Sequence, residues 1–371
     1  MVGSVIQGPI VLNNLDTYVY QSWHGTLITI AVILFVVSFN TLLAVRLPLI
    51  EGLLLILHIG GLFAIIIPLW VMAPRGTVHN TLFKFTTTGG WSNLGLASLI
   101  GMVNPIGVLI GYDCSVHMSE EVQDASIVLP KALIWSVVPN GLMALVMGAT
   151  FIFCIGDVDE VLASPTYEPF IQVFFNATQS YAGATIMTLI IMIMLTSACI
   201  SEVATASRQL WSFARDGGVP FSGWLSHVSP GWNIPIRAVF VSVLISTLLS
   251  LINIGSYVAL NAINSLGVVS LLFSYTVTIS CLVWRRLYGA PLPPRPWSLG
   301  KYGLPINVIS ICFVTPLLFF AFWPVSANPD ATGLNWSPVM FVSILVVALV
   351  YYVVWARHVY TGPVVLVKRD D

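Results

Sequence analysis

The residues best suited to chemistry lie together in one apolar stretch, where Gly111, Tyr112 and Asp113 are consecutive and His117 lies four residues after the acid. A carboxylate inside a hydrocarbon span costs about 2.5–3.5 kcal/mol on insertion scales, so it has to face protein or water. If a helix resumes after Tyr112, Asp113 and His117 share one face. Such a pair could relay a proton. A histidine that is simply packed in the core or at the interface is the alternative for His117.

The stretch that holds these residues, 94–117, is interrupted by Gly101, Pro105, Gly107 and Gly111. Freed backbone groups survive in lipid only where they line a cavity or find protein partners. Broken helices of this kind build the midplane sites of secondary transporters. Packing alone explains the G-x-x-x-G spacing, but it does not explain Asp113. The sequence therefore predicts a functional break at about 110–114.

Two other apolar segments carry clustered polar side chains. Hydroxyls such as those of Thr196 and Ser197 can bond across helices or coordinate an ion or substrate. Residues 261, 264 and 265 fall at i, i+3 and i+4, which is one helix face. Packing is an equal alternative for both segments. The pattern makes Asn261 and Asn264 candidates for substrate binding, and Asp113, His117, Thr196 and Ser197 candidates for proton or ion coupling.

Signatures of other functions are missing from the sequence. It contains no G-x-S-x-G, H-E-x-x-H or G-x-x-x-x-G-K-[ST] motif, so we expect no enzyme activity. The 5 cysteines form no C-x-x-C pair, and they read better as buried small hydrophobes than as disulfides or metal ligands. We therefore expect no cofactor and no metal. The net charge of −1 argues against a nucleic-acid partner.

Composition indicates the class of protein that positions these residues. The 371 residues are 57% hydrophobic and 8% charged, whereas soluble domains carry about 25% charged residues. A span needs about 20 apolar residues. The sequence predicts an all-α, multi-pass membrane protein whose single domain covers residues 1–371 and whose partner is the lipid bilayer. The predicted spans are 25–44, 51–73, 94–117, 132–155, 183–206, 238–254, 258–283, 304–323 and 338–356.

The basic residues predict the orientation of these spans. With the N-terminus outside, twelve of the 14 Lys and Arg residues lie on the inner side and only Arg75 and Lys84 lie outside, as the positive-inside rule requires. Two glycosylation sequons, at Asn176 and Asn335, then fall in outer loops. Tryptophans near span ends, among them Trp91 and Trp323, fit an interfacial belt.

Several short motifs resemble one transporter family. Segments 111–113 (GYD), 118–121 (MSEE) and 130–132 resemble the sixth-helix signature of amino acid–polyamine–organocation permeases. Segments 207–208 and 214–220 resemble the loop after that family's eighth helix. Segment 47–52 (LPLIEG) is similar to the fungal branch that carries GABA, choline and related amino acids.

The resemblance implies a fold of two inverted five-helix repeats, with broken first and sixth helices flanking the substrate. It implies that Gly111, Tyr112 and Asp113 form the sixth-helix break and bind the substrate there. The nine predicted spans would match the family's fourth to twelfth helices, so the sequence is expected to lack counterparts of the first three. It implies secondary, proton-coupled transport of an amino acid or a small organic amine, with small-molecule substrate and proton as partners. The plasma membrane is expected, and an endomembrane such as the vacuole is the alternative. A non-transporting permease fragment, or a membrane partner of a full-length permease, is the alternative function.

Overall fold

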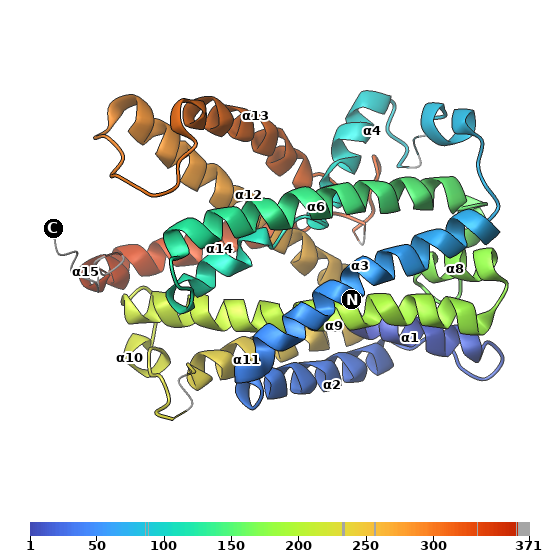
Figure 1. Ribbon diagram of the computed structural model, residues 1–371, viewed down its shortest axis with the longest axis horizontal. Helices are drawn as coiled ribbons and strands as arrows, with labels where there is room; N and C mark the ends of the chain where they lie inside the picture. Colours follow the sequence, from blue (N-terminus) through green and yellow to red (C-terminus); the bar gives the residue numbers. More distant parts are fainter. Residues whose placement is uncertain are drawn as a thin grey trace. The chain divides into compact units, whose positions relative to one another are not determined.

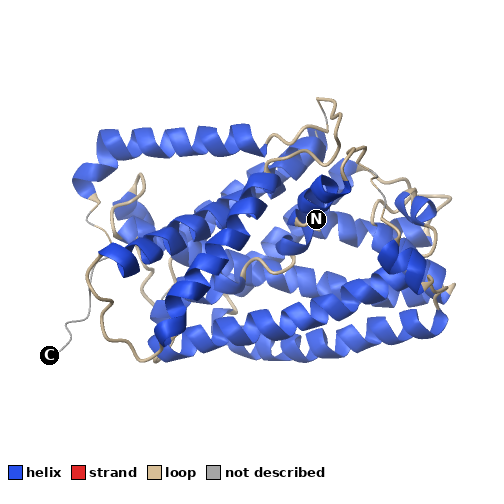
Figure 2. Ribbon diagram, turned by 90° about the horizontal axis from the view of Figure 1, so that it is seen from above, coloured by secondary structure: helices blue, strands red, loops and turns tan. Residues whose placement is uncertain are grey.

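The structure is a computed structural model that describes residues 1–85, 87, 89–231, 234–255, 257–331, 333–360 and 362. Within these ranges the side chains of Val45 and residues 257–261 lie outside the description. The described chain is built of helices (Figures 1 and 2) and divides into two compact units, the first formed by Met1–Lys84, Gly141–Gly255 and Tyr360–Asp371, the second by Phe85–Asn140 and Ser256–Val359.

The first unit is a bundle with one long central helix. Its helices are α1 (Val2–Asn13), α2 (Ser22–Thr41), α3 (Leu47–Met72), α7 (Val158–Leu162), α8 (Pro169–Thr178), α9 (Tyr181–Arg215), α10 (Ser222–Leu225) and α11 (Ile236–Gly255), with short turns at Ala44–Arg46 and His79–Phe83. Helices α1, α2, α3, α8 and α11 all pack on α9 (Figure 1). The core lies where α7 and α8 fold onto α3 and α9, and Ile171, Phe174 and Leu69 are fully buried there.

The second unit contains the broken span. It comprises α4 (Leu94–Gly101), α5 (Val103–Gly107), a 3₁₀ segment η3 (Tyr112–Glu121), α12 (Tyr257–Tyr288), α13 (Gly303–Ala321), α14 (Ser337–Tyr351) and α15 (Arg357–Val359), with short turns at Gly300–Tyr302 and Tyr352–Ala356. Helix α12 packs against α13 and α14, and α4 and α5 pack against α13. Val269, Leu272 and Leu317 form its core. Helix α6 (Ala125–Cys154) contributes its first part to this unit and its last part to the other.

The predicted class is confirmed. In the described ranges, nine helical segments are long and apolar enough to cross a membrane. Many large apolar side chains on them are exposed, such as Trp135 at 75% and Val347 at 68%, as a lipid-facing surface requires.

Several helices extend beyond the predicted spans. Helix α9 continues to Arg215 rather than 206, and α6 begins at Ala125 rather than 132. For α9 the reason is composition, because the polar turns beyond residue 206 carry no hydropathy signal although their backbone hydrogen bonds continue.

Candidate functional site

The third span is interrupted where the sequence predicts. Asn93 caps α4, because its side-chain oxygen accepts hydrogen bonds from the N–H groups of Gly95 (2.7 Å) and Leu96 (3.3 Å). Regular helix ends at Gly107, and Gly111 then takes a left-handed conformation with φ +98°. Only glycine adopts that backbone without strain. The 3₁₀ segment that follows begins at Tyr112, so the break presents Tyr112 and Asp113 directly after the turn.

Asp113 and His117 come together beyond the break. The His117 Nε2 atom lies 3.6 Å from Asp113 Oδ2, and the two side chains are 28% and 20% exposed. The predicted shared face is therefore present, on a 3₁₀ segment rather than an α-helix. An imidazole and a carboxylate at this separation lie beyond the roughly 2.6–3.2 Å of direct proton transfer, so the two side chains have to approach more closely before they can exchange a proton.

Tyr275 of α12 is a member of this cluster that sequence reasoning missed. Its ring lies 5.6 Å from the Tyr112 ring, centroid to centroid. Its hydroxyl oxygen is buried, and the polar groups facing it include Asp113 and Tyr112. One tyrosine in a long apolar helix carries no sequence signal of its own, because the contact depends on how α12 packs beside the break.

The other predicted site residues lie on α9 and α12. Thr196 and Ser197 lie on α9 in the first unit, and the Ser197 hydroxyl donates to the Ile193 carbonyl oxygen (2.8 Å). Asn264 lies on α12 and is exposed, while the Asn261 side chain lies outside the described residues. Their roles in binding and coupling stay predictions.

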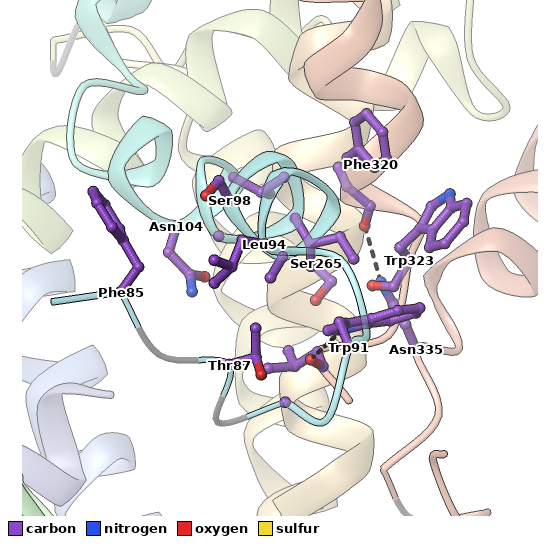
Figure 3. Close-up of a pocket in the computed structure, with 17 residues that line it drawn as sticks. Phe85, Thr87, Trp91, Leu94, Ser98, Asn104, Ser265, Phe320, Trp323 and Asn335 are labelled. Carbon is purple, nitrogen blue, oxygen red and sulfur yellow. Dashed lines mark hydrogen bonds between the residues drawn. The ribbon is translucent and has the colours of Figure 1, made fainter. Parts of the chain in front are cut away.

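A cavity of about 280 Å³ lies in the second unit, beside α4, α5, α12 and the end of α13 (Figure 3). Ser265, the third residue of the predicted polar face on α12, lines it, but Asn264 does not. Trp91 and Trp323, which fit an interfacial belt by sequence, form part of its wall. The residues of the Gly111 break are not among those that line it.

Both sequon asparagines make hydrogen bonds through their side-chain amides. Asn176 Nδ2 donates to Glu160 Oε1 (3.1 Å). Asn335 Nδ2 donates to the carbonyl oxygens of Ala321 (2.9 Å) and Trp323 (3.3 Å). A glycan on either nitrogen would compete with these bonds, and glycosylation stays a prediction at both positions.

Comparisons of the sequence with a family model and with known proteins agree on one family. The sequence matches the model for amino acid permeases over residues 1–350. An uncharacterised amino-acid permease of Schizosaccharomyces pombe is 30% identical over 97% of this chain and 63% of its own length. Amino-acid permease 2 of Neurospora crassa is 27% identical over 83% of this chain and 56% of its own length. A choline transporter of Saccharomyces cerevisiae is 27% identical over 90% of this chain and 59% of its own length. The chain thus spans roughly three fifths of these relatives.

Proposed function

Since this chain belongs to the amino acid permease family, we propose that it carries out secondary active transport of amino acids or small organic amines such as GABA or choline. Protons are proposed to drive this transport through Asp113 and His117, in the plasma membrane.

The observation that carries the proposal is the break at Gly111. It places an acid, a histidine and an aromatic ring together inside a membrane-length segment. Neither helix packing nor a solvated surface accounts for a carboxylate at such a position, because hydrocarbon penalises the charge. A site that binds a charged substrate and releases it again does account for it.

The aromatic groups at the break favour an amine as the charged part of the substrate. Tyr112 and Tyr275 present two rings next to the Asp113 carboxylate. An ammonium group is attracted both to ring faces and to a carboxylate. The relatives' names include amino-acid permeases and a choline transporter, and both substrate classes carry such a cation.

Uptake measurements test the proposal. The chain is expressed in a cell without its own choline and GABA uptake, and radiolabelled choline, GABA and amino acids are followed at pH 5 and pH 7.5. We expect concentrative uptake that an uncoupler abolishes. Asp113→Asn and Tyr112→Ala should impair it at unchanged surface level. Near-normal uptake in both variants would refute the assignment of the site.

The alternative function, a non-transporting fragment or partner of a full-length permease, would give a different result in the same uptake assay. The chain spans 63% of the Schizosaccharomyces pombe relative and 56% of the Neurospora crassa relative. A chain that reaches the membrane but moves none of these substrates would favour a partner of a full-length permease. Co-purification with such a permease would then be the measurement.

A further inference from the structure

The cavity in the second unit has one rigid aromatic wall. The rings of Trp91 and Trp323 lie 5.6 Å apart, centroid to centroid. The Trp91 indole N–H donates to the Val325 carbonyl oxygen (3.0 Å), and Asn335 Nδ2 donates to the Trp323 carbonyl oxygen (3.3 Å). Figure 3 shows Trp91, Trp323 and Asn335 grouped on one side of the cavity. This wall is therefore held in place before any ligand arrives, which lowers the entropy lost on binding.

The remaining wall carries polar side chains. Ser98 of α4 and Asn104 of α5, both exposed, and the part-buried Ser265 of α12 line the cavity, and their side chains make no hydrogen bond to any described residue. Ser197 and Ser310, in contrast, donate to the carbonyl oxygen four residues earlier in their own helices. Three polar side chains from three helices, without partners among the described residues, therefore converge on one small space, as in a ligand site.

The charge of the cavity restricts its ligand. None of the 17 lining residues is charged. A carboxylate or phosphate would find no cation there, so an anion is disfavoured. Indole faces attract cations more strongly than other aromatic side chains do, and the oxygen atoms of Ser98, Asn104 and Ser265 can accept hydrogen bonds. The volume of about 280 Å³ is close to the lower end for small-molecule pockets, about 300 Å³.

We propose that this cavity is a second binding site, for a small organic cation that bears an ammonium or methylated ammonium group and no acid group. It is separate from the break, because Gly111, Tyr112 and Asp113 do not line it. The cation packs against Trp91 and Trp323, and its polar end bonds to Ser98, Asn104 and Ser265. The site goes beyond the proposed transport function and does not depend on it.

Choline binding to the purified 371-residue chain that carries Asp113→Asn tests this site, since that variant removes the carboxylate charge proposed to bind substrate at the break. Tritiated choline binding is measured by scintillation proximity in lipid nanodiscs, with GABA as the zwitterionic competitor. We expect saturable choline binding that GABA displaces poorly. Absence of saturable binding in this background would overturn the proposal. Failure of uptake by the wild-type chain would refute the transport function and leave this result untouched.

Graded substitutions separate cation recognition from simple volume. Trp323→Leu should weaken choline binding about tenfold, the size of one lost cation–π contact, and Trp323→Phe should weaken it less. Ser265→Ala should also weaken it without unfolding the chain, which thermal melting checks. Trp284→Leu is the control, because Trp284 is 67% exposed on α12 and outside the cavity. Equal affinity in wild-type, Trp323→Leu and Ser265→Ala chains would overturn the proposal.

Discussion

At the scale of single residues, Tyr275 illustrates what packing adds to sequence. Its hydroxyl oxygen is buried beside Tyr112 and Asp113. Asp113 and His117 could be selected from type and spacing, because an acid in an apolar span is costly and a spacing of four is local. Tyr275 lies more than 150 residues further along the chain, so no local pattern connects it to the break.

We expect Tyr275→Phe to reduce uptake about tenfold, or about 1.4 kcal/mol, the size of one hydrogen bond to a charged group. The buried Tyr275 hydroxyl oxygen has no hydrogen-bond partner among the described residues, so in this hypothesis it bonds to the substrate beside Asp113, and the phenyl ring keeps the packing. Initial rates of choline and GABA uptake measure the effect. Tyr288→Phe is the matched control, since Tyr288 lies on the same helix and is 74% exposed. Equal uptake by the two variants would argue against a role for the Tyr275 hydroxyl.

Glu168, the residue before α8, gives a prediction about pH and stability. Burial raises the pKa of its carboxyl group, and a hydrogen bond with Ser4 opposes this rise. The folded chain therefore binds this proton more tightly than the unfolded chain does. Stability consequently falls as pH rises from the unfolded pKa, about 4.3, through the raised folded pKa.

Glu168→Gln removes this pH dependence. We expect the variant to melt at a higher temperature than the wild-type chain at pH 7.5, with the difference disappearing near pH 4. Melting in detergent, followed by tryptophan fluorescence, measures it. Asp159→Asn, at an exposed position on α7, should leave the pH dependence of the wild-type chain in place. A difference between Glu168→Gln and wild type that grows toward low pH would contradict the assignment.

At the scale of elements, the broken span was predictable because its causes are local. Asn93 caps its start, Pro105 lacks a backbone donor and Gly111 permits the left-handed turn. The α7–α8 hairpin was not predicted, because α8 has only 10 residues and is too short to read as a span. Its position depends on the burial of Ile171 and Phe174 against α9, which follows directly, and against α3, which is distant in sequence. The cavity escaped for the same reason, since it joins four separate helices.

Gly111→Ala tests whether the turn itself is required. An L-residue with φ +98° is strained by about 1–3 kcal/mol, so we expect a lower melting temperature and a large loss of uptake. Gly107→Ala is the matched control, because Gly107 has ordinary helical backbone and no atom within 4 Å of an added Cβ. That change should be nearly neutral for stability. Equal losses in the two variants would mean that the backbone turn is not what matters.

At the scale of the whole molecule, composition decides more than any motif. With only 8% charged residues, the chain has far fewer charges than a soluble domain, which carries about 25%. The described structure accordingly keeps large apolar side chains exposed on its membrane-length helices. The spans are then recognised as separate runs of about 20 apolar residues. The side of the membrane on which each loop lies follows instead from Lys and Arg, because basic loops are retained on the inner side.

The predicted orientation can be tested at two exposed loop positions. Lys84 lies in an outer loop in this orientation and Arg295 in an inner loop, and both are exposed in the structure. Each is replaced by cysteine in a chain whose 5 native cysteines are changed to serine or alanine. A membrane-impermeant maleimide should label Lys84→Cys in intact cells, and Arg295→Cys only after permeabilisation. Because twelve of the 14 basic residues determine this orientation together, removing one at either position should not invert it. Labelling of Arg295→Cys but not Lys84→Cys in intact cells would show that the orientation is the reverse of the predicted one. The Asp113–His117 pair would then face proton entry from the opposite side of the membrane.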